Sequence, residues 1–296
     1  MKISKAISIL AAGFVMATAS TAVMAQTVVV GGKNFTEQLL MASMTSQLLQ
    51  AKGFKPDIKA GMGSAVVRQA LENGQVDVYW EYTGTSLITY NKVTEKLSAA
   101  DTYKRVKELD AAKGLVWLNP SNANNTYALA MNADEAKKQG ITTISDLAAK
   151  IKGGAKLTLA SSAEFYARPD GLKPLEQAYG FEFGREDVKR MDSGLLYQAL
   201  RDKQVNVSVV FATDGRIPAF NLVVLKDDKG FFPTYALTPV VTKKFLDANP
   251  KVADILNSLS AKLDDATIAR LNATVDVDKK TVEEVAHNFL KQQGLI

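Results

Sequence analysis

A helix–turn–strand unit occurs twice in this chain and constrains its fold more than any other sequence feature. The 19 positions from Ser64 to Tyr82 align with those from Ser193 to Phe211, and seven of them carry identical residues. Duplication of one unit and convergence of capped helices onto the same residue types both account for the match. Each copy ends its strand with an aromatic residue. We therefore expect two related halves, each built from strands and helices.

Around the first copy, β-branched strands alternate with apolar helical segments. Residues 26–31 predict a strand, residues 37–52 a helix, and residues 56–60 a second strand. Asn34 and Thr36 precede this helix and are residue types that favour helix caps. The alternation predicts an α/β layered fold.

The rest of the chain indicates how the halves are joined. Residues 131–139 predict a charged helix, and the tail from residue 242 is mostly helical. No low-complexity linker separates the halves, which suits crossovers through strands. We expect a first lobe at residues 26–128, a second lobe at 129–235, and a return to the first lobe at 236–296.

The N-terminal residues predict export. Lys2 and Lys5 precede an uncharged apolar run at residues 6–16, and the small residues up to Ala25 suit cleavage by a signal peptidase. Residues 1–25 are therefore expected to form a signal peptide cleaved near Ala25. A transmembrane anchor is the alternative, but a bilayer requires roughly 20 apolar residues. Because no cysteine is present to carry a lipid, we expect a freely diffusing periplasmic protein.

The amino-acid composition restricts the chemistry that a functional site in this chain could use. Without cysteine there are no disulfides, thiol nucleophiles or thiolate metal ligands. His287 is the only histidine, so His-based zinc sites are excluded, and we expect no catalytic residue, metal or cofactor. The net charge of +5 is spread without a basic block, so no nucleic-acid partner is expected. Catalysis by carboxylates alone stays open, with Glu81, Glu164 and Asp214 as candidate acids.

Four aromatic residues at or near predicted strand ends favour a binding site. They are Tyr82, Tyr127, Phe211 and Tyr235. A quaternary ammonium ion has no N–H group, but aromatic faces attract it at roughly 0.5–2 kcal/mol for each cation–π contact. Packing in the core is the alternative for any one of these rings. A carboxylate on the same ligand would need fixed cations and hydroxyls, for which Lys33, Arg168 and Thr85 are candidates.

Five segments carry a family resemblance. They are residues 32–38 (GKNFTEQ), 80–85 (WEYTGT), 125–129 (NTYAL), 213–217 (TDGRI) and 227–235 (DDKGFFPTY). Together they resemble the substrate-binding proteins of osmoprotectant ABC transporters of the glycine betaine/choline type. The resemblance spans nearly the whole mature chain. It implies a two-lobed type II periplasmic binding protein whose ligand lies in a cleft between the lobes.

By this resemblance, specific residues acquire binding roles. A box around the quaternary ammonium group would be formed by Tyr82, Tyr127, Phe211 and Tyr235. The ligand carboxylate would be held by Lys33, Thr85 and Arg168. Phe211 departs from the family, in which tyrosine is usual at this position, and it keeps the ring face but loses the hydroxyl.

The resemblance also implies a function. We expect a monomeric, non-enzymatic carrier that delivers a quaternary ammonium osmolyte to an ABC permease and its ATPase. Glycine betaine is the first candidate for this osmolyte. The alternatives are choline, another small zwitterion such as proline or carnitine, or a periplasmic enzyme that depends on carboxylates.

Overall fold

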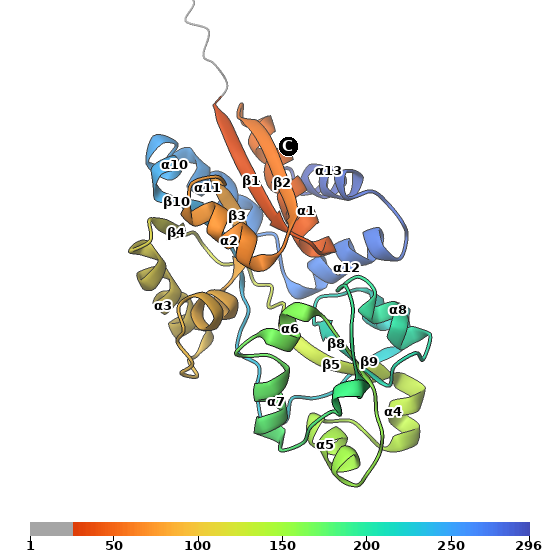
Figure 1. The fold of residues 1–296 in the computed structure, drawn as a ribbon. Helices are drawn as coiled ribbons and strands as arrows, with labels where there is room; N and C mark the ends of the chain where they lie inside the picture. Colours follow the sequence, from red (N-terminus) through yellow and green to blue (C-terminus); the bar gives the residue numbers. More distant parts are fainter. Residues whose placement is uncertain (1–25) are drawn as a thin grey trace, which may run out of the picture.

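Two five-stranded mixed sheets organise the chain (Figure 1). The computed structural model describes residues 26–296, so the expected signal peptide lies outside the described residues. In sheet order, the first sheet consists of β2 (Lys55–Met62), β1 (Thr27–Lys33), β3 (Val78–Tyr82), β10 (Leu237–Thr242) and β4 (Leu115–Trp117). The second consists of β7 (Val188–Arg190), β6 (Leu159–Ser161), β8 (Val207–Phe211), β5 (Tyr127–Asn132) and β9 (Leu222–Val224). The predicted α/β class is confirmed.

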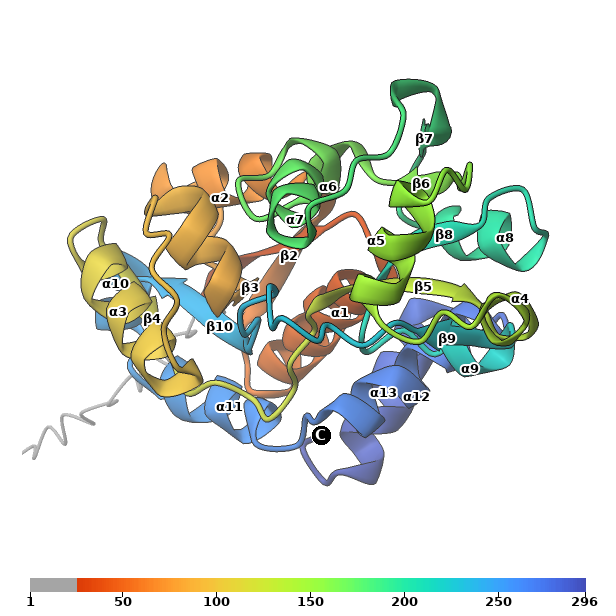
Figure 2. The same ribbon diagram turned by 90° about the horizontal axis from the view of Figure 1, so that it is seen from below.

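Helices surround both sheets (Figures 1 and 2). Those grouped with the first sheet are α1 (Thr36–Ala51), α2 (Ser64–Glu72), the π-helical turn η1 (Thr85–Tyr90), α3 (Ala99–Ala111), α10 (Lys243–Ala248), α11 (Lys251–Ser260), α12 (Asp265–Asp276) and α13 (Val282–Gln292). Those grouped with the second are α4 (Ala133–Gln139), α5 (Ile144–Lys152), α6 (Ala163–Ala167), α7 (Leu172–Tyr179), the short turn η2 (Arg185–Asp187), α8 (Leu196–Arg201) and α9 (Arg216–Ala219).

The two sequence copies occupy equivalent places in the two sheets. In the first copy, α2 leads into β3, which lies between parallel β1 and antiparallel β10. In the second, α8 leads into β8, which lies between parallel β6 and antiparallel β5. The chain passes from the first sheet to the second between β4 and β5 and returns between β9 and β10. The exact lobe boundaries stay a prediction.

Helix α1 is the central helix beside the first sheet. It packs on β1 and β2, and helices α11, α12 and α13 contact it as well, so residues such as Leu40, Met44 and Leu48 are fully buried. The expected side-chain cap is absent, because Phe35 holds the N-cap position and makes no such bond. The Thr36 hydroxyl instead donates to Asp276 Oδ1 at 2.8 Å. Thr36, a residue type that often caps helices, therefore links α1 to α12 by a hydrogen bond.

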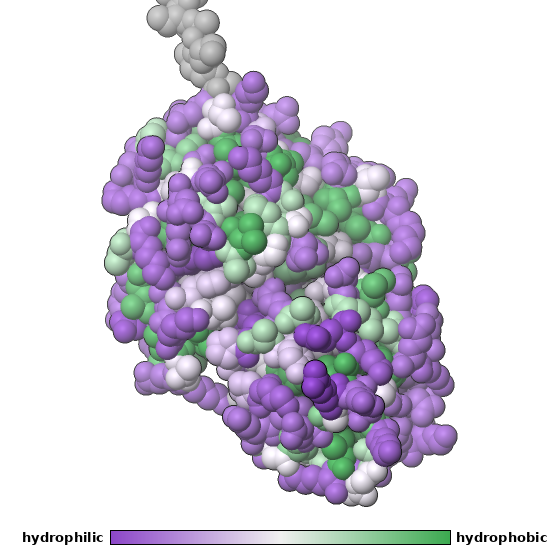
Figure 3. Space-filling view, in the orientation of Figure 1, coloured by the Kyte–Doolittle hydropathy of each residue, from purple (hydrophilic) through white to green (hydrophobic). Residues whose placement is uncertain are grey.

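The face of the molecule that Figure 3 shows is largely hydrophilic. In Figure 3, hydrophilic side chains dominate the visible face, and the hydrophobic ones form separate small areas between them. Such scattered apolar exposure is normal for a folded domain in water. Across residues 26–296, no helix combines the length and the apolar character that crossing a membrane requires.

A buried ion pair joins α2 to α3 beside the first sheet. The Arg68 guanidinium donates two hydrogen bonds, of 2.8 and 2.7 Å, to the fully buried Asp110 carboxylate. Trp117 Nε1 and the Ser86 hydroxyl also donate to Asp110, each at 2.8 Å. Burial acts to raise the pKa of the Asp110 carboxyl, but the bonds from Arg68 outweigh it and lower the pKa to about 2.

We expect Asp110→Asn to lower the free energy of unfolding by about 3–5 kcal/mol, because it leaves the buried Arg68 charge without its main partner. Glu72→Gln is the matched control: it removes a more exposed partner of the same arginine and should cost at most about 1 kcal/mol. Folding lowers the pKa of Asp110, so the ionised carboxylate stabilises the folded state. This stabilisation should be complete at pH values above the ordinary pKa range of aspartate and should disappear as the pH falls through about 2. Urea unfolding curves at several pH values measure both effects, and equal losses in the two variants would contradict the assignment.

Candidate functional site

Antiparallel pairing brings the four predicted aromatic residues to the junction between the sheets. Tyr127 begins β5 and lies in register with Phe211 at the end of β8. Tyr82 ends β3 opposite Leu237, and Tyr235 precedes that residue by two positions. The Tyr127 ring lies 5.1 Å from the Phe211 ring and 5.6 Å from the Tyr235 ring, measured between centroids. Residues distant in sequence therefore meet because their strands end at the same place.

A fifth ring, which sequence reasoning did not single out, completes this group. Phe35 stacks on Phe211 at 5.1 Å and on Tyr82 at 6.3 Å, with interplanar angles of 15° and 23°. It thus links a ring from the first sheet to a ring from the second. The segment 32–38 contains Phe35, but sequence alone does not reveal which way its ring turns. We call Phe35, Tyr82, Tyr127, Phe211 and Tyr235 the aromatic cluster.

The two predicted cations lie beside the aromatic cluster and are paired within the protein. The Lys33 ammonium lies 2.5 Å from Glu81 Oε1 and 4.9 Å from the centre of the Tyr82 ring. The Arg168 guanidinium donates two hydrogen bonds of 2.7 Å to Asp170, and its central carbon lies 5.2 Å from the Tyr127 ring centre. Each cation faces a tyrosine ring, so these rings are oriented to accept positive charge.

Thr85 is bonded to one of the two predicted cations, Arg168. Its hydroxyl accepts a hydrogen bond of 3.3 Å from Arg168 Nη2, which joins η1 to the residue that follows α6. Lys33 and Thr85 line the same small space as all five rings of the aromatic cluster, whereas Arg168 does not line it. The structure therefore brings Lys33, Thr85 and Arg168 close to one another, and their contact with a ligand stays a prediction.

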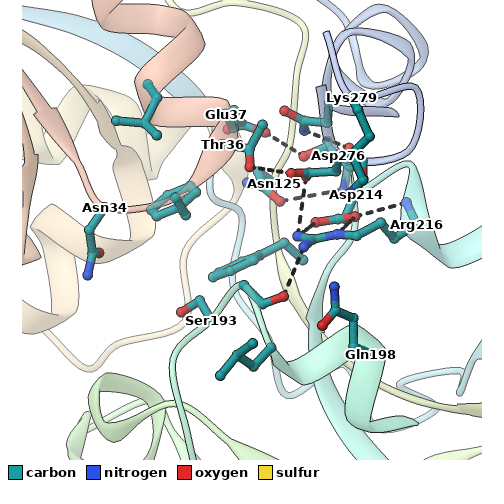
Figure 4. A pocket seen from close by; sticks show the side chains of 17 residues that line it. Asn34, Thr36, Glu37, Asn125, Ser193, Gln198, Asp214, Arg216, Asp276 and Lys279 are labelled. Atoms are coloured by element: carbon teal, nitrogen blue, oxygen red, sulfur yellow. Dashed lines mark hydrogen bonds and ion pairs between the residues drawn. The ribbon is translucent and has the colours of Figure 1, made fainter. Parts of the chain in front are cut away.

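The space at the aromatic cluster is narrow. It measures about 20 Å³, which is room for little more than one water molecule. A larger polar cavity of about 340 Å³ adjoins it, and Asn34, Phe35, Asn125, Ser193 and Phe211 line both spaces. Figure 4 shows this polar cavity, with Asp214, Arg216 and Asp276 close together on one side. A ligand larger than water therefore requires the rings or the lobes to move apart.

Glu37 is a buried carboxylate that lines the larger cavity. Its side chain is 3% exposed and accepts hydrogen bonds from the Tyr82 hydroxyl at 2.7 Å and the Thr213 hydroxyl at 2.6 Å. Burial raises the pKa of the Glu37 carboxyl, while these two bonds act in the opposite direction. Burial and the nearby Glu37 charge raise the pKa of the Tyr82 hydroxyl well above its usual range. Tyr82 is therefore a protonated donor at neutral pH.

The carboxylates considered for catalysis each have a partner within the protein. Glu81 binds Lys33 and accepts a hydrogen bond of 2.6 Å from the Tyr79 hydroxyl. Glu164 accepts a hydrogen bond of 2.8 Å from the Ser64 hydroxyl of α2. Asp214 accepts two hydrogen bonds, of 2.9 and 2.6 Å, from the Arg216 guanidinium. Within residues 26–296 no cluster of three or more histidine, cysteine or carboxylate side chains could hold a metal ion.

Comparisons with known proteins agree on one family. A family model described as the substrate-binding domain of an ABC-type glycine betaine transport system matches residues 26–292. A glycine-betaine-binding protein of Pseudomonas aeruginosa is 45% identical over 92% of this chain and 89% of its own length. The glycine betaine-binding protein YehZ of Escherichia coli is 35% identical over 91% of this chain and 92% of its own. A solved structure described as a glycine betaine/carnitine/choline ABC transporter is 30% identical, covers 90% of this chain and 99% of its own, and superposes with a TM-score of 0.73.

The position of the Tyr235 ring depends on close contact with Gly84. A β-carbon at Gly84 would lie 2.8 Å from the Thr234 carbonyl oxygen and 2.9 Å from Tyr235 Cδ1. We expect Gly84→Ala to lower the free energy of unfolding by about 1–3 kcal/mol, because the ring must shift. In Gly63→Ala the new β-carbon meets no atom within 4 Å, and stability should change by less than about 1 kcal/mol. Chemical denaturation compares them, and equal stability of the two variants would show that the contact is not tight.

Proposed function

The chain belongs to the family of substrate-binding domains of ABC-type glycine betaine transport systems, and we propose that it captures glycine betaine for such an importer. The observation that carries this proposal is the aromatic cluster, in which rings from both sheets converge and two tyrosines already face cations. A trimethylammonium group offers no hydrogen-bond donor, so a set of aromatic faces suits it. The relatives from Pseudomonas aeruginosa and Escherichia coli, both described as binding glycine betaine, support the same ligand.

We propose that Lys33, Thr85 and Arg168 hold the ligand carboxylate. Lys33 has three N–H donors, and one of them points at Glu81. Arg168 and Thr85 are already joined by a hydrogen bond beside the rings. A carboxylate between them would be bound by charge-assisted hydrogen bonds, which are stronger than neutral ones. Choline, which lacks the carboxylate, would leave these donors without that partner.

Ligand binding is proposed to require hinge motion between two lobes. We assign residues 26–128 and 236–296 to one lobe and residues 129–235 to the other. The narrow space at the aromatic cluster would widen as the lobes separate, and would enclose the ligand as they close. The hydrogen bonds from Ser64 to Glu164 and from Thr213 to Glu37 join the two assigned lobes. They would break on opening and form again on closure.

The proposed carrier has no catalytic activity and works in the periplasm. Its family is one of transport proteins, and each carboxylate considered for catalysis has a partner within the protein. We propose that residues 1–25 direct export and are removed near Ala25. The mature carrier would then dock on an ABC permease that an ATPase drives.

Calorimetry with betaine, choline, carnitine and proline tests the proposed ligand. Betaine should bind most tightly, and Tyr82→Ala should weaken its binding roughly 5- to 30-fold, which corresponds to about 1–2 kcal/mol for one lost cation–π contact. Tyr103→Ala is the control, because the Tyr103 hydroxyl donates to the Leu118 carbonyl away from the rings. No binding of any of the four compounds would refute the proposal. Unchanged betaine affinity in folded Tyr82→Ala would refute the aromatic box.

The preference for a carboxylate is tested at Arg168. Arg168→Ala should remove the advantage of betaine over choline, because the betaine carboxylate loses a charged partner. Arg190→Ala is the matched control, since Arg190 lies over the Tyr166 ring, 5.1 Å from its centre, and should leave both affinities unchanged. Melting temperatures check folding, because Arg168 is also bonded to Asp170. Tighter binding of choline than of betaine by the native protein would contradict the assignment.

A further inference from the structure

Two tyrosines of the aromatic cluster donate their hydroxyl protons to buried carboxylates. The Tyr82 hydroxyl donates to Glu37 at 2.7 Å, and the Tyr235 hydroxyl donates to Asp170 at 2.6 Å. The carboxylates are 3% and 5% exposed, respectively. Neither lines the small space at the aromatic cluster, and Glu37 lines the adjoining larger cavity instead. Each can therefore act on a bound ligand only through space or through the tyrosine.

The two carboxylates differ in how their charge is balanced. Asp170 binds the Arg168 guanidinium through two hydrogen bonds of 2.7 Å, so its charge is compensated. Glu37 forms no salt bridge within the described part of the chain. Neutral donors surround it instead: the hydroxyls of Tyr82 and Thr213, with the side-chain amides of Asn125 and Asn272 close by. It also lies in the first turn of the 16-residue helix α1, where the helix dipole favours a negative charge.

A carboxylate that accepts a phenol proton changes the charge distribution of the phenol. The O–H bond is polarised toward the acceptor, and electron density on the oxygen and the ring increases. Attraction of a cation to a ring depends on the negative potential of its face. The face of Tyr82 already has a positive group near it, because the Lys33 ammonium lies 4.9 Å from the ring centre. Glu37 therefore adds to the attraction at a ring face that is positioned for cations.

We propose that Glu37 determines the preference of the site for a cationic headgroup, by supplying negative charge to the Tyr82 ring through the Tyr82 hydroxyl. The inference rests on the proposed function, because it assumes that the aromatic cluster encloses the ligand. It assigns Glu37 a positioning and electrostatic role without contact with the ligand. A quaternary ammonium group has no N–H to donate to a carboxylate. Glu37, bonded to the Tyr82 hydroxyl, provides a counter-charge without occupying space between the rings.

The test compares glycine betaine with tert-butylacetate, its carbon isostere, which has the same shape and carboxylate but no positive charge. Affinities are measured by calorimetry, with tert-butylacetate in competition against betaine. Glu37→Gln keeps the size of the side chain and removes its charge. It should weaken betaine about three- to tenfold, a part of what a whole cation–π contact contributes, and change tert-butylacetate less than twofold. Equal losses for both ligands, or no loss for either, would overturn the proposal.

A double-mutant cycle separates action through the hydroxyl from action through space. Tyr82→Phe keeps the ring and removes the hydroxyl, so it should reduce the preference for betaine over the isostere as Glu37→Gln does. If the hydroxyl carries the effect, adding Glu37→Gln to Tyr82→Phe should lower that preference little further. If Glu37→Gln lowers the preference for betaine as much in the Tyr82→Phe background as in the wild-type protein, the route through the Tyr82 hydroxyl is refuted.

Thr213→Val controls for a purely structural role of Glu37. It removes the hydroxyl that joins the β8–α9 loop to Glu37 while the carboxylate and Tyr82 remain, so both ligands should change by the same factor. A selective loss of betaine in Thr213→Val would show that loop position, not charge, sets the preference. Failure of the wild-type protein to bind any quaternary ammonium compound would refute the proposed function itself. Wild-type binding of betaine with equal losses in Glu37→Gln would refute only the role of Glu37.

Discussion

The antiparallel pairing of β3 with β10 and of β5 with β8 fixes the position of the whole site. Each pair places the end of one strand beside the start of its partner, so that Tyr127 lies in register with Phe211, and Tyr82 lies in register with Leu237, two residues after Tyr235. Within each sheet, the backbone hydrogen bonds of these pairs determine where the strand-end rings stand, whereas Phe35 links a ring of one sheet to a ring of the other. The position of the four strand-end rings is therefore a product of sheet topology.

Buried charge around the rings is balanced by nearby partners at two of three places. Lys33 lies against Glu81, and Arg168 lies against Asp170, in both cases with less than a tenth of either side chain exposed. A buried charge without a partner is costly, so loss of either member of a pair would destabilise the folded protein. Glu37 is the exception, because hydroxyl and amide donors surround it. Because no cation compensates its burial, the pKa of the Glu37 carboxyl is raised.

Sequence patterns predicted the first strands and helices, the repeated unit and the aromatic residues at or near strand ends. The repeated unit predicted two equivalent halves because its helix, turn and strand are local features, and α2–β3 and α8–β8 occupy equivalent places. The helix predicted from residue 131 begins at Ala133 instead, because Met131 pairs with Val223 in the second sheet and Asn132 caps α4. Phe35 and Glu37 were within a recognised motif, but their roles depend on contacts with Phe211 and Thr213. Such contacts across long sequence separations are set by tertiary packing and cannot be deduced from local composition.

The narrow space between the rings has a consequence for the lifetime of a complex. With the ligand site and the hinge motion proposed above, a molecule enclosed by the five rings leaves only after the protein opens, and hinge motions of this kind take microseconds to milliseconds. Dissociation is then timed by the hydrogen bonds that span the cleft, such as the one from Ser64 to Glu164, as well as by the groups that touch the molecule. A substitution at the rim of the cleft can hasten release while the groups in contact with the ligand stay as they are.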